Sequence, residues 1–339
     1  MMHAIPPLKP SSRSVDGLSW KSYNWLVASV ILVVLMVFMV AGRAGRDHFA
    51  AIAMKGDPAF YLDFAGRAVP EIQDQDLFYH NIGGSIDAAR QADIVLLGPS
   101  FVSYAFEPSL LRQFEAQQGV RIYNMSFIGI RGGEFTRRII ARWQIRPRIW
   151  IINADDQFVH FFSRSLDLTL GPVTTQIPAA SRLRMRGFAS VAGRNLRWRL
   201  EGADGSAPGL YRDIGTGDVT VDSNPRYIAD DNKQIRFDRG ADCHVNPDTV
   251  AIAREYLKEI QGRVVLTLVP HSQYCPTQAR ELAQALGLEI IIPPDQGYTS
   301  IDGGGHLDRT SALKFTAFLL SELARSEAFA GLRNARNGS

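Results

Sequence analysis

Short apolar runs alternate with helical segments along most of the chain, and this alternation constrains the fold more than any other feature. The clearest run is DIVLLG at 93–98, a continuous apolar stretch followed by Pro99. Such a run is typical of a strand buried on both faces of a parallel sheet. Helical spacing follows in SLLRQFEAQQ, between Pro108 and Gly119. Proline favours the first helical position and glycine the position just past a helix end, so both bounds are predicted.

The same pattern continues to residue 323. We expect further strands at 120–124, 148–153, 263–269 and 288–292, and further helices at 134–143, 248–260, 276–286 and 311–323. Strands that alternate with helices of about 10 to 15 residues form right-handed βαβ units, with helices on both faces of a parallel sheet. The sequence therefore predicts an α/β fold, a three-layer sandwich.

Two parts of the chain fall outside this pattern. Residues 43–90 mix polar and apolar residues with prolines and glycines, so we expect a helical or irregular lead-in. From about 161 to 242 the pattern stops, which indicates an insertion into a domain at 91–330. The basic part of this insertion, 182–199, can bind an anionic glycan, lipid headgroups or a partner protein, or can form a solvated basic helix.

Trp25–Ala41, WLVASVILVVLMVFMVA, is a stretch of seventeen residues without a charge. With its neighbours it reaches about twenty residues, nearly enough to cross a ~30 Å hydrocarbon core at ~1.5 Å per residue. We expect an uncleaved transmembrane anchor at 24–42 after a cytoplasmic tail at 1–23. The alternatives are a buried core helix and a cleaved signal peptide, although the polar lead is long and VAGR at 40–43 is a poor cleavage site.

Lysines and arginines near the apolar segment indicate its orientation only weakly. A first and only span with a short tail is most often inserted with that tail in the cytoplasm. We therefore expect a single-pass membrane protein whose domain, from about residue 45 onward, lies outside the cytoplasm. Cys243 and Cys275, the only cysteines, then lie in an oxidising compartment. A disulfide between them would contribute about 3 to 4 kcal/mol, and two unrelated buried thiols are the alternative.

The composition excludes several classes of function. Lys and Arg number 37 against 34 Asp and Glu, and a net charge of +3 is too small to favour nucleic acid as the main partner. Two cysteines exclude a cysteine-based zinc or iron–sulfur cluster. A nucleotide-binding protein is poorly supported, because no strand is followed by Gly-x-Gly-x-x-Gly or a Walker loop. Asp155 and Asp156 lack a third ligand, so we expect neither a metal site nor a cofactor.

Polar residues that can do chemistry lie in loops at the carboxyl ends of the expected strands, where parallel sheets bind ligands. They are Ser100 after the first strand, Asn124 at the end of the second, Asp155, Asp156 and Gln157 after the third, His271 after the strand at 263–269, and Asp302 and His306 before the last helix. Acyl transfer needs a hydroxyl nucleophile, a base and a carboxylate that fixes the tautomer of the base. The loops therefore supply the residue types for a serine acyl-transfer site.

The order Ser, Asp, His along the chain fits two families. An α/β-hydrolase places its serine in Gly-x-Ser-x-Gly after several strands. Ser100 instead follows the first strand and lacks the second glycine. The chain resembles the SGNH or GDSL-like hydrolases over about 93–158 and 264–323. LLGPSFVSYAFEPSLL, YNMSFIGIRGGE, IINADDQF and DGGGHLDRTSALKFTAFL are similar to its membrane-anchored branch, which includes proteins that transfer D-alanine onto teichoic acids and that acetylate alginate.

The resemblance implies a parallel sheet of the SGNH or flavodoxin type. It also implies a serine esterase or O-acyltransferase that acts on a cell-envelope polysaccharide or glycolipid. Ser100 would be the nucleophile, His306 the base and Asp302 the carboxylate that orients it. Gly129 and the Ser100 amide would donate hydrogen bonds to the oxyanion. A membrane-bound O-acyltransferase is the partner that the resemblance implies, beside the membrane itself.

The chain departs from the family pattern at two points. Three glycines separate Asp302 from His306, where the family has two residues, and glycines with positive φ can absorb the extra residue in a bulge. The asparagine of the third block is missing, so Gln157 is our substitute oxyanion donor, with Asn153 less favoured because it lies on the strand. Asn124, Asp155, Asp156 and His271 are assigned to the lining of the substrate site.

These departures leave alternatives open. Ser100 can merely cap the following helix and His306 can be a structural histidine, while Asp308 is expected as an N-terminal helix cap. The whole domain can be a catalytically inactive SGNH fold that binds carbohydrate or a partner in an envelope polysaccharide assembly complex. The distance between the serine hydroxyl and the imidazole in the folded domain discriminates between the enzyme and the inactive subunit.

Overall fold

The computed structural model describes residues 23–34, 36, 60–64, 74–79, 81–127, 133–155, 158, 210–221, 233–235 and 243–337. The chain divides into two compact units, Met1–Ala44 and Gly45–Ser339. In the first unit residues 23–34 and 36 are helical with exposed side chains. The rest of the expected anchor lies outside the described residues. Within the described part of the chain, no helix combines the length and the apolar character needed to cross a membrane.

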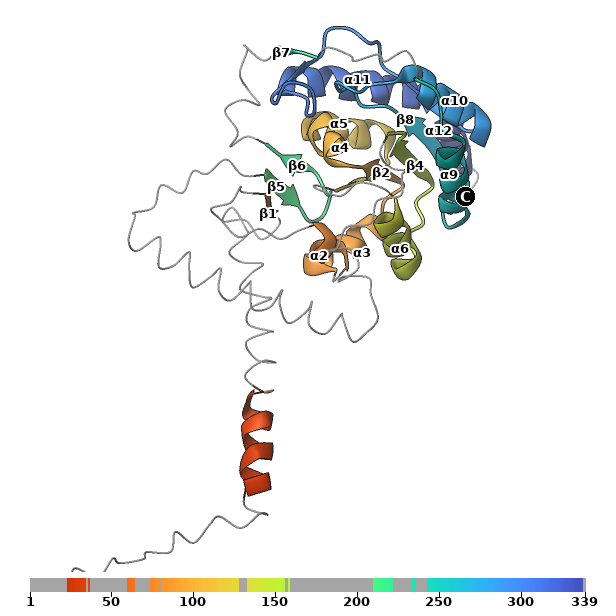
Figure 1. Ribbon diagram of the computed structural model, residues 1–339. Helices are drawn as coiled ribbons and strands as arrows, with labels where there is room; N and C mark the ends of the chain where they lie inside the picture. Colours follow the sequence, from red (N-terminus) through yellow and green to blue (C-terminus); the bar gives the residue numbers. More distant parts are fainter. Residues whose placement is uncertain are drawn as a thin grey trace, which may run out of the picture. The chain divides into compact units, whose positions relative to one another are not determined.

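A five-stranded parallel sheet, the central sheet, lies in the second unit (Figure 1). Its strands are β2 (Ile94–Gly98), β3 (Ile122–Ser126), β4 (Ile149–Asn153), β8 (Arg263–Thr267) and β9 (Glu289–Ile291). They pair in the order β3-β2-β4-β8-β9, so the chain adds β3 on one side of β2 and then β4 on the other. The carboxyl ends of β2 and β4 flank the point where the order reverses, which is the usual ligand position in open α/β sheets.

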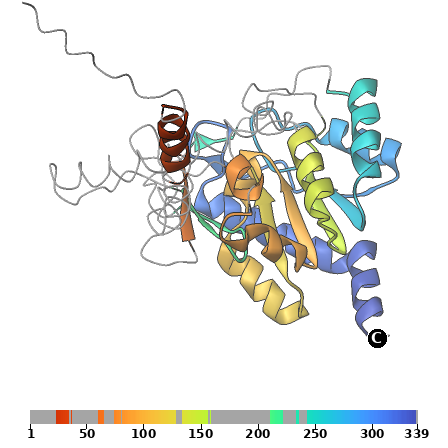
Figure 2. The same ribbon diagram turned by 90° about the horizontal axis from the view of Figure 1, so that it is seen from below.

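Helices pack on both faces of the central sheet (Figures 1 and 2). Side chains alternate along each strand, so Val95 and Leu97 face one set of helices, and Ile94 and Leu96 face the other. The first set is α2 (Asp74–Tyr79), α3 (Ser85–Arg90), α6 (Glu134–Trp143), α9 (Pro247–Lys258) and α10 (Pro276–Leu286). The second set is α4 (Ser100–Ala105), α5 (Pro108–Gln118), α11 (Arg309–Arg325) and α12 (Glu327–Asn337). The predicted α/β class is confirmed.

Most elements of the central sheet and its helices lie where the sequence predicts them. α5 begins at Pro108 and ends before Gly119, whose φ is 65°. α6 and α10 have their predicted ranges, whereas β3 lies two residues further along than expected. α2 and the 3₁₀ turn Ile82–Gly84 lie in the lead-in that was expected to be helical or irregular. The short helix α4 was not predicted, and neither was α12, which extends the fold beyond residue 330.

A second sheet joins one strand of the lead-in, which was otherwise expected to be helical or irregular, to strands of the insertion, where no regular pattern was expected. β1 (Phe60–Phe64) pairs antiparallel with β5 (Leu210–Asp213), and β5 pairs with β6 (Val219–Thr220). We call these three strands the small sheet. β7 (Lys233–Gln234) forms a further pair with β10 (Thr299–Ser300). Strands of two to five residues carry too little periodicity to be recognised. The basic part of the insertion lies outside the described residues.

The turn between β5 and β6 packs on β3, the edge strand of the central sheet. The amide of Asn124 donates to the carbonyl of Thr216 (2.8 Å). A Cβ on Gly217 would lie 2.1 Å from the Asn124 carbonyl oxygen, and its φ is 70°, so only glycine fits. Arg212 is fully buried. Its guanidinium donates to the carbonyls of Asn124 (3.2 Å), Ser126 (3.0 Å) and Gly217 (3.1 Å). These bonds make the small sheet an integral part of the domain.

Candidate active site

Ser100, His306 and Asp302 form one chain of hydrogen bonds. Nε2 of His306 lies 3.0 Å from Oγ of Ser100, and Nδ1 lies 2.6 Å from Oδ2 of Asp302. The contact at Nδ1 holds the imidazole so that Nε2 faces the serine hydroxyl. A nucleophile, a base and an orienting carboxylate in hydrogen-bond contact are the groups that acyl transfer requires. We call these three residues the relay.

A tight turn at the end of β2 positions Ser100. A Cβ on Gly98 would lie 2.4 Å from Cγ2 of Val102 and 2.9 Å from Cβ of Asn153, so the strand end has no room for a side chain there. Pro99 is extended (φ −74°, ψ −170°) and is the N-cap of α4, which Ser100 begins. Ser100 therefore does not occupy the cap position itself. The turn places it at the carboxyl edge of the sheet, where β2 neighbours β4.

The three glycines fold into a loop around the Asp302 carboxylate. Gly303 has a φ of 87° and Gly304 a φ of 152°, backbone conformations that glycine adopts without steric cost, as expected for this run. Oδ1 of Asp302 accepts backbone hydrogen bonds from Gly305 (2.7 Å), His306 (3.0 Å) and Gly304 (3.3 Å). Oδ2 remains for the imidazole. The longer spacing is therefore compatible with a closed relay.

The hydrogen bonds also set the charge of Asp302. Burial raises the pKa of its carboxyl, but the hydrogen bonds from the His306 ring and from the amides of His306 and Gly305 lower it more. The net result is a pKa well below the ordinary value for aspartate. The carboxylate is consequently ionised at neutral pH, so it stabilises the imidazolium that forms when His306 accepts a proton.

Two aromatic side chains of α4 contact the imidazole of His306. The ring centroid of Tyr104 lies 4.4 Å from that of His306, and the centroid of Phe101 lies 5.7 Å from it. Tyr104 also packs with Ile301 and with residues of the inserted segment, namely Leu210, Val219 and Val221. The small sheet thus supports a ring that contacts the base. The sequence analysis missed both aromatic residues, although their spacing of three places them on one helix face.

Backbone contacts join the two ends of the segment 302–306, which we call the relay loop. Ser300 and Leu307 form a β-bridge, and the amide of Ile301 donates to the carbonyl of His306 (3.0 Å). Asp308 then accepts the amide of Ser311 (2.9 Å) as the N-cap of α11, which confirms its predicted role. The loop is therefore held between β10 and α11.

The residues assigned to the oxyanion site are only partly described. Gly129 and Gln157 lie outside the described residues, as does Asp156. Asn124 is 1% exposed, and its Oδ1 accepts the amide of Ser126 (3.1 Å), so its side chain does not line an open surface in this structure. Asn153 is fully buried, and its Oδ1 accepts the amide of Val269 (2.9 Å).

Asp155 and His271, both assigned to the lining, lie in contact. Oδ2 of Asp155 is 2.5 Å from Nε2 of His271. The His271 ring stacks on Phe101, with centroids 4.7 Å apart and planes at 11°. Phe101 follows Ser100 and also contacts His306. The pair of Asp155 and His271 is therefore connected to the relay by the ring of Phe101.

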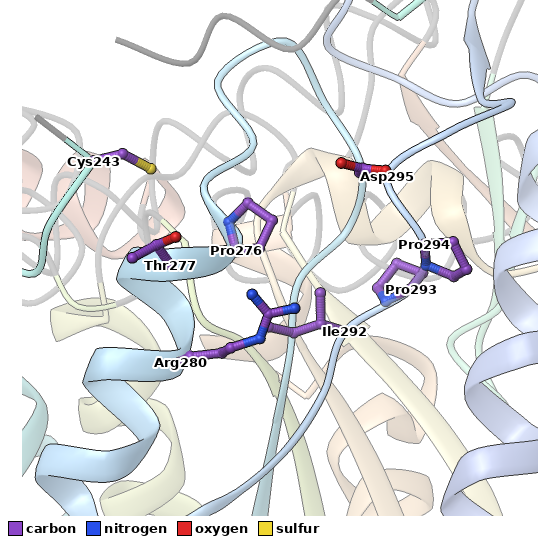
Figure 3. A pocket seen from close by; sticks show the side chains of 8 residues that line it. All are labelled: Cys243, Pro276, Thr277, Arg280, Ile292, Pro293, Pro294 and Asp295. Atoms are coloured by element: carbon purple, nitrogen blue, oxygen red, sulfur yellow. The ribbon is translucent and has the colours of Figure 1, made fainter. Parts of the chain in front are cut away.

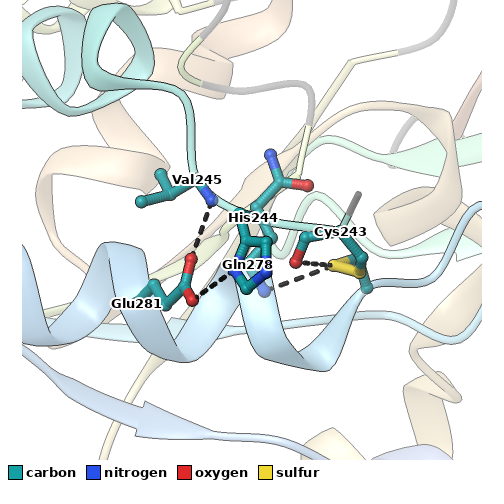
Figure 4. Close-up of a disulfide and its surroundings, with 6 residues drawn as sticks. Cys243, His244, Val245, Gln278 and Glu281 are labelled. Atoms are coloured by element: carbon teal, nitrogen blue, oxygen red, sulfur yellow. Dashed lines mark hydrogen bonds and ion pairs between the residues drawn. A yellow bond between two sulfur atoms is a disulfide. The ribbon is translucent and has the colours of Figure 1, made fainter. Parts of the chain in front are cut away.

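Cys243 and Cys275 form a disulfide (Figure 4), with Cα atoms 6.0 Å apart. Sγ of Cys275 also accepts the amide of Gln278 (3.2 Å) and caps α10. Beside the bond, Glu281 accepts the amide of Val245 (2.8 Å) and contacts the His244 ring (2.7 Å). Both hydrogen bonds lower the pKa of Glu281, and the one from the backbone of Val245 has the larger effect. The disulfide therefore ties the segment before α9 to the start of α10.

A cavity of about 430 Å³ opens beside the disulfide (Figure 3). Its walls are Cys243, Pro276, Thr277 and Arg280 on one side and Ile292, Pro293, Pro294 and Asp295 on the other. No residue of the relay lines this cavity. It is therefore separate from the candidate active site.

The candidate active site is built from four loops at one edge of the central sheet. These loops follow β2, β4, β8 and β10, and they bring Ser100, Asp155, His271 and the Asp302–His306 loop together. The geometry suits proton transfer between a serine hydroxyl and an imidazole. No protein-family model matches the chain, and searches of curated proteins and of solved structures found no match.

Proposed function

We propose that this protein is a serine esterase or O-acyltransferase of the SGNH type that acts on a cell-envelope polysaccharide or glycolipid. The observation that carries the proposal is the relay, in which Nε2 of His306 lies 3.0 Å from Oγ of Ser100 while Asp302 binds Nδ1. The sequence motifs that resemble SGNH hydrolases support it. The position of the serine after the first strand of the central sheet also supports it.

The proposed reaction proceeds in two proton-coupled steps. Oγ of Ser100 attacks an acyl carbonyl while Nε2 of His306 takes the hydroxyl proton, and Asp302 stabilises the resulting imidazolium. The imidazolium then gives the proton to the leaving group, which leaves an acyl ester on Ser100. An acceptor hydroxyl, from water or a sugar, gives its proton to His306 and attacks that ester. The bond from the acyl carbon to Oγ of Ser100 then breaks, and Oγ takes the proton back from His306. The amides of Ser100 and Gly129 are the proposed donors to the oxyanion.

We also propose a membrane anchor at 24–42 that holds the domain on the periplasmic face of a bacterial inner membrane. The uncharged run Trp25–Ala41 supports the anchor. The disulfide supports an oxidising compartment. A membrane-bound O-acyltransferase is the proposed donor partner, because an anchored acyl-transfer domain can receive its acyl group at the bilayer surface.

One observation favours the catalytically inactive alternative. Asp155 or Asp156 stands where the resembled family has an asparagine that donates to the oxyanion, and a carboxylate opposes a developing negative charge. The other argument for that alternative, the longer spacing between Asp302 and His306, loses its force because the relay closes. An inactive subunit would bind an envelope polysaccharide or a partner without forming an acyl-enzyme.

The experiment that separates these functions is the pre-steady-state hydrolysis of p-nitrophenyl acetate by the full-length chain in mild detergent. We expect a burst of p-nitrophenol in the wild type. Ser100→Ala and His306→Ala should each lose on the order of 10³-fold or more in turnover. Ser321→Ala and His244→Gln change exposed residues of the same types and should keep wild-type rates.

Turnover that is equal in the wild type and Ser100→Ala would contradict the enzyme proposal. Circular dichroism of each variant establishes that it is folded. Folded protein without serine-dependent turnover would favour the inactive binding subunit.

A further inference from the structure

A second imidazole–carboxylate pair lies beside the relay. Nε2 of His271 is 2.5 Å from Oδ2 of Asp155. Asp155 follows β4 and His271 follows β8, two neighbouring parallel strands whose register pairs Asn153 with Thr267. Both residues therefore reach the carboxyl edge of the sheet, the edge at which Ser100 lies. The proposed proton transfers use neither of them.

His271 is placed to hold Asp155 and not to act as a second base. It is 2% exposed, and its Nδ1 accepts the backbone N–H of Gln273 (3.1 Å). A ring nitrogen that accepts a hydrogen bond carries no proton, so the proton of the neutral imidazole is on Nε2. Nε2 lies 2.5 Å from Oδ2 of Asp155 but has no aligned hydrogen-bond partner among the described residues. Neither ring nitrogen then has a lone pair free to take a proton from substrate.

Packing fixes the pair relative to both ends of the relay. The His271 ring stacks on Phe101, the residue after the nucleophile. Ser272 donates its backbone N–H to the carbonyl of Gly304 (2.7 Å) in the relay loop. A Cβ on Gly304 would lie 2.6 Å from Cβ of Ser272, so the two segments are in close contact. The position of Asp155 is therefore tied to the nucleophile and to the base.

The second carboxylate oxygen of Asp155, Oδ1, is available to another partner. Its side chain is 28% exposed, and no described residue binds Oδ1. A fixed carboxylate close to an oxyanion site works against the transition state, unless that oxygen accepts a hydrogen bond in the reacting complex. A hydroxyl of the acyl acceptor is a donor of the required kind.

We propose that Asp155, held by His271, binds an acceptor that carries two adjacent hydroxyls, as sugars and other polyols do. This inference rests on the proposed function and specifies its acceptor. One hydroxyl donates to Oδ1 of Asp155, which orients its neighbour toward the acyl-enzyme. The neighbour gives its proton to Nε2 of His306 as its oxygen bonds to the acyl carbon. The bond from that carbon to Oγ of Ser100 breaks, and Oγ takes the proton back from His306. The products are the acylated polyol and free Ser100.

The test compares 1,2-propanediol with 1-propanol as acceptors for the full-length chain and p-nitrophenyl acetate. The acetate esters and free acetate are quantified, together with the p-nitrophenol burst that reports formation of the acyl-enzyme. Asp155→Asn should lower the ratio of diol ester to acetate about tenfold, the effect of losing one charge-assisted hydrogen bond. The 1-propanol ratio should fall less than the diol ratio. The burst should be at least as fast as in the wild type, because the substitution removes a charge that opposes the oxyanion. His271→Gln should lower the diol ratio in the same direction.

Asp248→Asn is the matched control, because Asp248 is an exposed carboxylate in the first turn of α9. It should leave both ratios at the wild-type values. A burst in the wild type with the same diol ratio in Asp155→Asn would overturn this inference and leave the proposed function standing. Loss of the burst in Asp155→Asn would also overturn it, since Asp155 would then serve acylation. A wild type without any burst would refute the proposed function and this inference with it.

Discussion

The central sheet and the small sheet support the same active site by different physical means. The central sheet is held by parallel strands with side chains buried on both faces, and its connections are local helices. The small sheet pairs Phe60 with Asp213 and packs on the domain through Arg212 and a turn at Gly217. The first region carries Ser100, whereas the second supports Tyr104, which contacts His306. The nucleophile therefore comes from a region held by local helices and buried strands, whereas the ring that supports the base depends on contacts between distant parts of the chain.

The largest expected effect is at Arg212, the buried residue that joins the two sheets. Arg212→Met leaves the carbonyls of Asn124, Ser126 and Gly217 without this donor, so it should lower the free energy of unfolding by about 3 to 5 kcal/mol. That loss is as large as the ~2 to 5 kcal/mol expected for Leu266→Ala in the core of the central sheet. Urea unfolding of the full-length chain measures both.

Arg212→Lys is the matched variant, because it keeps the charge and loses the planar fork, and it should cost less than Arg212→Met. A free energy of unfolding for Arg212→Met within ~0.5 kcal/mol of the wild type would be typical of a surface substitution and would contradict this role of Arg212. The small sheet would then be peripheral to the stability of the domain.

The next effect concerns the disulfide, which stabilises the region around α9 and α10 on one face of the central sheet. Replacing Cys243 and Cys275 together by serine should lower the free energy of unfolding by about 2 to 4 kcal/mol, because the cross-link no longer constrains the unfolded chain. A serine at 275 still caps α10, so the change isolates the cross-link. The burst of p-nitrophenol should persist, since the bond contacts no residue of the relay. A stability equal to that of the wild type would show that the bond contributes nothing.

Asp218 links the small sheet to α5 in a way that depends on pH. It lies 3.0 Å from Nε of Arg112, and burial raises its pKa to about 7 despite that cation. In the unfolded chain its pKa is near the ordinary 3.8, so between these values the folded state binds more protons than the unfolded state. The folded state is therefore destabilised through Asp218 as pH rises from about 4 to 7, by about 4 kcal/mol for the full shift.

Asp218→Asn removes this titration. The difference in free energy of unfolding between Asp218→Asn and the wild type should move in favour of the variant as pH rises from about 5 to 8. Chemical denaturation at several pH values measures it. A difference that does not vary with pH would refute the raised pKa of Asp218.

The smallest expected change in stability is in the relay loop, which contacts both regions. A Cβ on Gly304 would clash with Ser272, whereas one on Gly303 meets nothing within 4 Å, and both glycines have positive φ. Gly304→Ala should therefore cost about 1 kcal/mol more than Gly303→Ala and should slow the p-nitrophenol burst further. Thermal melting and burst kinetics of the two variants measure these effects. Equal burst rates would show that the contact with Ser272 does not position the loop.

Most of the central sheet could be predicted from the sequence because burial on both faces leaves a local signal. The runs at β2, β4 and β8 are apolar over successive residues, and Pro108 and Gly119 mark the ends of α5. The relay residues were named from motifs that resemble a known family. Their contact was left open, because three glycines separate Asp302 from His306 and Ser100 is distant from both in the sequence.

The small sheet and the second pair could not be predicted, because their determinants are tertiary. In the sequence Arg212 is one of many scattered arginines, and only the fold shows it buried beneath carbonyls of β3. The contact of Asp155 with His271 joins loops after two strands that are distant in the sequence. Phe101 and Tyr104 read as ordinary residues of a short helix until their neighbours are known.

Mass spectrometry of the full-length chain, quenched with acid during turnover of p-nitrophenyl acetate, would detect the acyl-enzyme itself. We predict one acetyl group on the peptide that contains Ser100, located on Ser100 by fragmentation and absent from Ser100→Ala. An acetyl group on a different residue, or turnover by the wild type without any acetylated Ser100, would contradict it.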